Sequence, residues 1–169
     1  MRNNKGFSLV ELIIVIAIMA ILVGVMAPQL IKYIEKTNVS SDTQLCDSVK
    51  TAITTAMMDP TVLEEAASTT LINTTLGSNE STLSNIGNST RFAKSVAETL
   101  GVDPSKLGTD IDKKIKSYNS NATPVIKFRI VSSNSVHVYI PGSDSRGAKG
   151  QSDKLTGAYN SGRDTIYVD

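Results

Sequence analysis

The sequence contains very few of the residues from which catalytic and metal sites are built. Its 169 residues include one cysteine, one histidine and no tryptophan. A single cysteine cannot close an internal disulfide bond, and one cysteine with one histidine cannot complete a zinc ligand set. No nucleophile has a recognisable base beside it in the sequence. The sequence therefore predicts a protein that is not an enzyme and that has no cofactor.

The chain also lacks an excess of charge of either sign. It has 17 Lys and Arg residues against 16 Asp and Glu residues, a net charge of +1. Nucleic-acid-binding domains usually carry a basic face, so no nucleic-acid partner is predicted. Three aspartates at 144, 153 and 164 lie in a Gly-rich stretch without the spacing of an EF-hand. His137 alternates outward on an expected strand, where we predict a solvated side chain. No metal site is predicted.

Apolar residues are abundant, but many of them lie near the N-terminus. The segment Phe7–Ala27 is an almost unbroken apolar run that ends at Pro28. A helix needs about 20 mostly apolar residues to cross a bilayer, so this run is long enough. Arg2 and Lys5 precede it and are expected to hold the N-terminus on the cytoplasmic side.

One acidic residue, Glu11, interrupts this run. A carboxylate at bilayer depth costs roughly 2.5–3.5 kcal/mol on insertion scales and usually has a function. A secretory signal peptide fits poorly, because the apolar core is too long and Pro28 follows the cleavage point. A plain membrane anchor with an incidental glutamate remains an alternative. The favoured interpretation is a segment that leaves the bilayer and packs against copies of itself.

The residues around Glu11 resemble the processing site of type IV prepilins with a class III leader. The matching stretch is Lys5-Gly6-Phe7-Ser8-Leu9-Val10-Glu11-Leu12, and the resemblance is most specific from Lys5 to Pro28. It implies that a prepilin peptidase cuts between Gly6 and Phe7 and that the new N-terminal Phe7 is N-methylated. It also implies that Glu11 is the glutamate used in subunit assembly.

Two departures from the family pattern concern the helix bend and the cysteines. Pro28 matches the helix-bending proline, but Ala20 stands where many pilins have a glycine. Gly24 is the nearby glycine here, so the helix kink is expected at Gly24 and Pro28. Because one cysteine cannot form the C-terminal disulfide of many Gram-negative pilins, the chain looks more like Gram-positive, type IVa-like major pilins.

A physical mechanism supports a joint role for Phe7 and Glu11. Cleavage after Gly6 frees an α-amine, and such amines ordinarily have a pKa of about 7.7–8, so they are largely cationic near neutral pH. Glu11 follows Phe7 by one helical turn. In a staggered bundle, Glu11 of one subunit can meet the Phe7 amine of the next. A paired buried charge costs far less than an unpaired one, so this pairing is expected to set the register.

The hydrophobicity pattern beyond this segment predicts an α+β fold with a long N-terminal spine. A cleaved basic leader (1–6) precedes a hydrophobic transmembrane and polymerisation helix (7–31) and an amphipathic half of the spine helix (32–59). A globular head (60–169) follows, with short helices at about 61–73 and 91–100 and strands at about 125–131, 136–140 and 164–168. The antiparallel sheet is expected to pack on the apolar stripe of the spine, and 141–163 is expected to be a long loop.

The resemblance implies a structural function rather than chemistry. It indicates the major subunit of a type IV pilus, a helical homopolymer used for motility, adhesion or biofilm. The implied partners are the prepilin peptidase/N-methyltransferase, an assembly platform with its ATPase, and the cytoplasmic membrane before assembly. A pseudopilin of a type II secretion system and a competence (DNA-uptake) pilin share the same N-terminal motif and remain alternatives.

Overall fold

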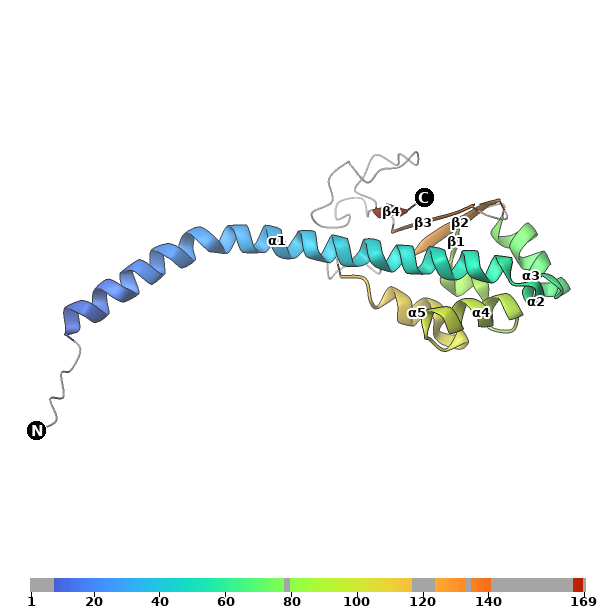
Figure 1. Cartoon of the computed structure of the whole chain (residues 1–169), viewed down its shortest axis with the longest axis horizontal. Helices are drawn as coiled ribbons and strands as arrows, with labels where there is room; N and C mark the ends of the chain where they lie inside the picture. Colours follow the sequence, from blue (N-terminus) through green and yellow to red (C-terminus); the bar gives the residue numbers. More distant parts are fainter. Residues whose placement is uncertain (1–7, 78–79, 117–123, 133–134, 141–165, 169) are drawn as a thin grey trace, which may run out of the picture. The chain divides into compact units, whose positions relative to one another are not determined.

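The computed structural model of the chain describes residues 8–77, 80–116, 124–132, 135–140 and 166–168 (Figure 1). The chain forms two compact units, Met1–Glu35 and Lys36–Asp169. Helix α1 (Leu9–Met58) contributes residues to both units. The second unit contains the remaining helices and the sheet, which together form the head.

Helix α1 confirms the predicted long helix, which was expected to run from Phe7 to residue 58. Phe7 itself lies outside the described residues. The polar stretch 37–43, which is the weakest part of the apolar pattern, is helical throughout. The hydroxyls of Thr43, Ser48 and Thr51 each donate to the backbone carbonyl four residues earlier, all at 2.9 Å. These bonds satisfy side chains that would otherwise compete with the helix for backbone groups.

The head contains a four-stranded antiparallel sheet in the order β1-β2-β3-β4. Its strands are β1 (Ser81–Thr82), β2 (Lys127–Ser132), β3 (Ser135–Ile140) and β4 (Ile166–Val168). Three of them correspond to the predicted strands at 125–131, 136–140 and 164–168, although residues 164 and 165 lie outside the described residues. The α+β class predicted from the sequence is therefore correct.

The alternation predicted around β2 is confirmed. Ile126, Phe128 and Ile130 are buried, whereas Arg129 is exposed. The strand begins at Lys127 rather than at residue 125. A register shift between Ile130 and Ser132 interrupts its pairing with β3, and Val131 beside it is 53% exposed.

Strand β3 departs from its predicted pattern at one position. Val136, Val138 and Ile140 are buried as expected, but Tyr139, which was expected to face outward, is only 4% exposed. Tyr139 lies opposite Lys127 on β2 and Tyr167 on β4. Since β3 has a paired strand on each side, cross-strand neighbours flank the side chains of both its faces.

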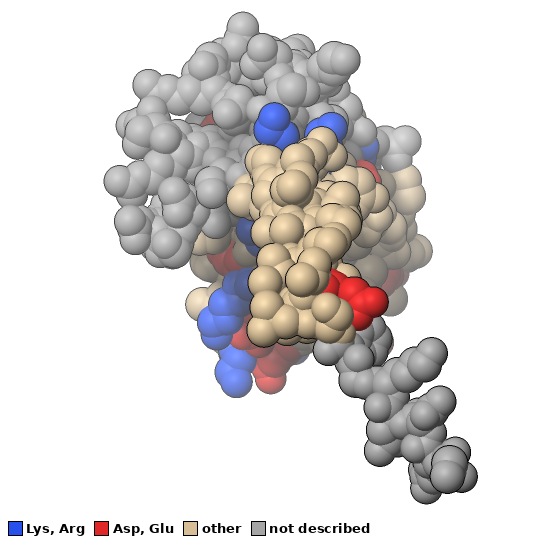
Figure 2. Space-filling view, turned by 90° about the vertical axis from the view of Figure 1, so that its left-hand side faces the viewer, with Lys and Arg blue, Asp and Glu red and all other residues tan. Residues whose placement is uncertain are grey.

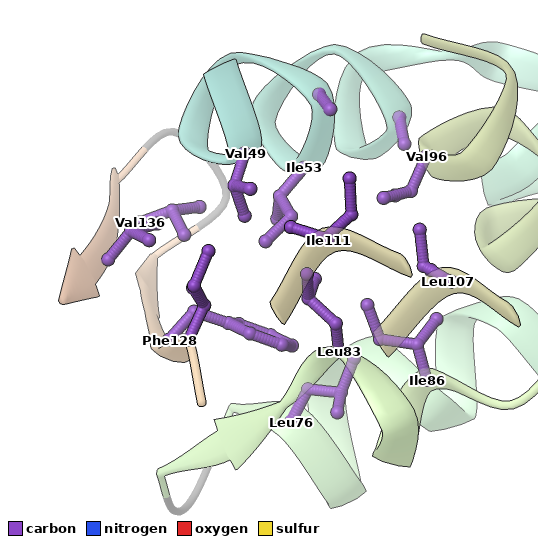
Figure 3. Close-up of a cluster of buried hydrophobic side chains, with 14 of the residues drawn as sticks. Val49, Ile53, Leu76, Leu83, Ile86, Val96, Leu107, Ile111, Phe128 and Val136 are labelled. Carbon is purple, nitrogen blue, oxygen red and sulfur yellow. The ribbon is translucent and has the colours of Figure 1, made fainter. Parts of the chain in front are cut away.

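The apolar stripe of α1 covers the sheet and completes a single hydrophobic core. Figure 3 shows Val49 and Ile53 pointing from α1 into the same cluster as Ile111 and Phe128. Cys46 is fully buried in this cluster, as the sequence predicts. Burial, with Asp42 and Asp47 nearby, raises the pKa of the Cys46 thiol to about 12. Cys46 thus packs as a small apolar side chain.

The helix predicted at 61–73 is wrong as one continuous element. It is divided into α2 (Pro60–Leu63), α3 (Ala66–Thr70) and the π-helical turn η1 (Leu71–Leu76). The break comes at Glu65, which has extended backbone angles (φ −83°, ψ 113°). The Glu65 carboxylate accepts the Arg91 backbone N–H at 2.6 Å. The helical pattern is thus broken at Glu65, the residue that bonds Arg91, 26 positions further along the chain.

Helix α4 (Arg91–Leu100) matches its predicted bounds and has an unusually complete N-terminal cap. The N–H of Arg91 donates to Glu65, that of Phe92 to the Ser68 hydroxyl at 3.1 Å, and that of Ala93 to the Thr90 hydroxyl at 3.2 Å. These contacts satisfy three of the four N–H groups that a helix start leaves without intrahelical partners. At the other end Gly101 has φ +65°, the left-handed helix end predicted for it.

We expect the Glu65 cap to make head stability depend on pH. Hydrogen bonds from the Ser68 hydroxyl and the Arg91 N–H lower the pKa of Glu65 below its ordinary 4.5. A lowered folded-state pKa stabilises the fold above the unfolded pKa, and this contribution is lost as the pH falls through the folded value. The free energy of unfolding in urea should therefore fall less for the Glu65→Gln variant than for the wild type as the pH decreases below about 4.5. Parallel losses in both proteins would contradict this role.

The stretch 74–89, expected to be a loop, contains regular elements in its described part. It contains the end of η1, strand β1 and the 3₁₀ helix η2 (Leu83–Ile86). Leu83 and Ile86 are buried, as their apolar character predicts. Pairing of β1 with β2 was not visible in the sequence, because it joins residues more than 40 positions apart.

The region 107–118, which the sequence left open between loop and short helix, begins with helix α5 (Leu107–Asp112). The 3₁₀ helix η3 (Pro104–Lys106) precedes α5. Two carboxylates tie α5 to its neighbours. Both oxygens of the fully buried Asp42 on α1 accept the Lys116 backbone N–H, at 2.9 and 3.2 Å. Asp112 accepts the Ile126 N–H at 2.9 Å, and burial raises the pKa of Asp112. These bonds hold the α5 end between α1 and the start of β2.

Candidate assembly segment

The described part of the first unit is one helix whose apolar side chains are all exposed. From Leu9 to Ile34, every described large apolar side chain is between 50% and 74% exposed. Single exposed apolar residues are ordinary, but a contiguous surface of this extent far exceeds the roughly 300–600 Å² patch of a typical soluble monomer. Such a surface requires a bilayer or other protein chains to cover it.

The same helix is apolar enough to cross a membrane. By length and composition α1 is the one such helix among the described residues, and none of its most apolar 18-residue stretch is buried. Figure 2 looks from the N-terminal side, and the part of the helix nearest the viewer is drawn almost entirely in the colour of uncharged residues. A signal sequence can meet the same criteria of length and composition. The motif at residues 5–12 is what distinguishes a membrane-spanning pilin helix from a signal sequence.

The structure shows a role for Ser8 that the sequence reasoning missed. The Ser8 backbone N–H donates to Glu11 Oε2 at 2.8 Å, and the Val10 N–H donates to Ser8 Oγ at 3.3 Å. The Glu11 contact is the glutamate half of a capping box, while the Ser8 hydroxyl caps the helix start through the N–H of Val10 rather than that of Glu11. The sequence signal for this cap is Ser8-Leu9-Val10-Glu11, a serine followed three residues later by a glutamate at the start of an apolar run.

The cap places the Glu11 carboxylate at the N-terminal end of α1. A carboxylate is favoured there by the helix dipole, and it has about four acceptor sites, of which the Ser8 N–H uses one. Glu11 can thus cap its own helix and still accept a further donor. Gly6 and Phe7, the predicted cleavage and methylation residues, lie outside the described residues.

Gly24 lies four residues before Pro28, so its carbonyl is the one that the residue at position 28 would bond in a regular helix. Helix α1 includes Pro28, which has no N–H to donate. The weakest backbone bonding therefore falls at the residue with the greatest backbone freedom. The kink expected at these two residues stays a prediction.

The described residues contain no group of three or more His, Cys, Asp or Glu side chains that could hold a metal ion. The loop aspartates at 144, 153 and 164 lie outside those residues. His137 lies on β3 opposite Arg129 and is half-buried, rather than solvated as expected.

Comparison with known proteins agrees with the geometry of the N-terminal segment. Residues 1–27 match the family model of the prokaryotic N-terminal methylation motif. The chain is 46% identical over 55 residues to a fimbrial protein of Moraxella nonliquefaciens, covering 32% of this chain and 36% of the relative. It is 34% identical over 83 residues to a fimbrial protein of Pseudomonas aeruginosa, covering 49% and 54% respectively. A type IV major fimbrial protein FimA of Dichelobacter nodosus is 42% identical over 56 residues, 33% of this chain and 36% of the relative.

The matched regions span between about a third and a half of these relatives' own lengths. No solved structure is significantly similar to the chain. None of these matches tests the likeness to Gram-positive pilins, which rests on the single cysteine. The N-terminal part of the chain is thus similar to the methylation motif and to fimbrial proteins, one of which is a type IV major fimbrial protein.

Proposed function

We propose that this chain is a structural, non-enzymatic subunit, and the major pilin, of a type IV pilus. It assembles with copies of itself through its N-terminal helix into surface filaments that serve motility, adhesion or biofilm formation. The observation that carries the proposal is the exposed apolar surface of Leu9–Ile34, most of which lies within the methylation motif at residues 1–27. A plain anchor would account for the face, but not for the motif.

Processing would precede assembly. Before it, α1 would hold the chain in the cytoplasmic membrane as a single-pass anchor with the N-terminus inside. The prepilin peptidase would cut between Gly6 and Phe7 and methylate the new amine. An assembly platform and its ATPase would then extract the subunit, and the apolar face would exchange lipid for neighbouring subunits. The mature mass should lack the first six residues and contain one methyl group.

Glu11 and Phe7 would set the register during assembly. The Glu11 carboxylate caps its own helix and retains acceptor capacity, and the processed amine of a neighbouring Phe7 would supply the matching donor and charge. Loosening at Gly24 and Pro28 would let the helix adapt its curvature to the packed bundle. Phe7, Glu11 and Gly24 lie within the segment that matches the methylation motif, and Pro28 directly follows it.

The experiment that tests this function compares cells with and without the gene by electron microscopy. We expect long surface filaments to disappear in the deletion strain and to return when the wild-type gene is restored. A restored gene carrying Val131→Ala, a truncation at an exposed head position, serves as a matched control and should also return them. Intact filaments with lost protein secretion would instead indicate a pseudopilin, and intact filaments with lost transformation a competence pilin.

A further inference from the structure

A basic groove lies on the side of the head, between α1 and the end of α5. It has a volume of about 430 Å³ and is lined by Ser41, Gln44, Leu45 and Ser48 of α1 and by Lys113, Lys114 and Lys116. All of these residues belong to the second unit, Lys36–Asp169. The groove therefore combines three ammonium groups with uncharged polar side chains on a single described surface.

One ion pair among the described residues involves these lysines. Lys113 pairs with Asp110 at 3.5 Å, a contact that solvent screens because the Lys113 side chain is 76% exposed. Within the described residues, Lys114 and Lys116 form no ion pair. The next residues, 117–123, read Ser-Tyr-Asn-Ser-Asn-Ala-Thr and contain no acid. The lower left of Figure 2 shows Lys or Arg side chains with acidic ones beside them on the exposed surface.

The backbone that presents these lysines is fixed. Both oxygens of Asp42 accept the Lys116 N–H, and Asp42 is fully buried on α1. The Asp42 charge lies close to the groove, but it is already bonded to the backbone. The hydrogen bond from Lys116 to Asp42 thus ties the lysine-bearing wall of the groove to α1.

The groove follows the apolar segment closely along the chain. Ser41 comes ten residues after Ile31, which is about 15 Å along a helix at 1.5 Å per residue. Headgroups extend about 5–7 Å beyond each side of the hydrocarbon core, and lysine side chains are long and flexible. If Leu9–Ile31 spans the bilayer, only about ten residues of chain separate the near end of the groove from the hydrocarbon core.

We propose that this groove binds the phosphate groups of anionic lipids while the subunit is anchored in the membrane. The inference rests on the anchored state in the proposed function. Lysine is a compact cation suited to phosphate, and a basic residue near an anionic surface contributes about 1 kcal/mol. The groove would hold the head against the membrane until assembly withdraws the subunit, when lipid is exchanged for neighbouring chains.

The test measures lysine acetylation rates of the full chain by mass spectrometry in two kinds of vesicle. One contains phosphatidylcholine alone, and the other contains phosphatidylcholine mixed with phosphatidylglycerol. We expect Lys113, Lys114 and Lys116 to react about threefold or more slowly in the anionic vesicles. Lys94 on α4, outside the groove, should keep its rate. Salt at about 1 M, where the screening length is about 3 Å, should remove the difference.

Variants sharpen the test. Lys114→Gln with Lys116→Gln should abolish the slowing at Lys113, whereas Lys50→Gln with Lys94→Gln removes the same charge elsewhere and should preserve it. Equal groove rates in both vesicles would overturn the proposal. If the groove lysines react more slowly than Lys94 to the same extent in both kinds of vesicle, a neighbouring copy covers the groove, and this result also overturns the proposal. A separate flotation assay tests whether the chain is anchored at all. If the chain does not float with neutral vesicles, the anchored state itself is contradicted.

Discussion

Replacing Glu11 by alanine or glutamine is expected to reduce surface filaments at least tenfold. In the proposed bundle, either change leaves the Phe7 amine of a neighbour without its counter-charge. Truncating one member of a buried charge pair costs about 2–5 kcal/mol, and 1.4 kcal/mol is already a tenfold change in an equilibrium constant. Filaments sheared from cells and quantified by immunoblot, with total protein as reference, provide the measurement.

The glutamine variant separates charge pairing from helix capping. Glutamine at the third helical position can still complete a capping box, so Glu11→Gln preserves the contact with the Ser8 N–H and removes only the charge. If Glu11→Gln assembles normally while Glu11→Ala does not, Glu11 acts as a cap and the pairing proposal is wrong. Glu64→Ala, at an exposed head position, is the control for loss of a glutamate and should assemble normally.

Phe128→Ala is expected to destabilise the head by about 3–5 kcal/mol, the usual cost of removing a buried aromatic side chain. Phe128 is fully buried on β2, and Figure 3 shows it in the same cluster as Leu83 and Ile111. Domains of this size are stable by only about 5–15 kcal/mol, so the loss is a large fraction of the total. Urea unfolding of the full chain in mild detergent, followed by circular dichroism, measures it.

Val131→Ala on the same strand is the matched control for this prediction. Val131 is 53% exposed, so its truncation should change stability by no more than about 0.5 kcal/mol, as is usual for surface positions. Equal destabilisation by the two substitutions would show that β2 does not pack its Phe128 face into the core. A normal unfolding midpoint for Phe128→Ala would show the same.

Local sequence patterns predicted much of the scaffold. Helix α1, the bounds of α4 and the buried face of β2 follow from the spacing of apolar residues, because 3.6-residue and two-residue periods place side chains on one face. Gly101 ends α4 with a positive φ, a conformation that glycine adopts at little cost. The segment from Lys5 to Glu11 also indicated the family, since its residues form a contiguous motif.

Contacts between distant residues decided the rest. Glu65 interrupts the predicted helix at 61–73 and bonds Arg91, Asp42 holds the backbone at Lys116, and Tyr139 is buried on a strand with two neighbours. None of these has a local signature, because each depends on which segments the fold brings together. The sequence by itself thus determined α1, α4, the buried face of β2 and the N-terminal motif. Only the tertiary structure decided where a helix must break and where three lysines meet, since long-range hydrogen bonds and burial outweigh the weak local preferences of single residues.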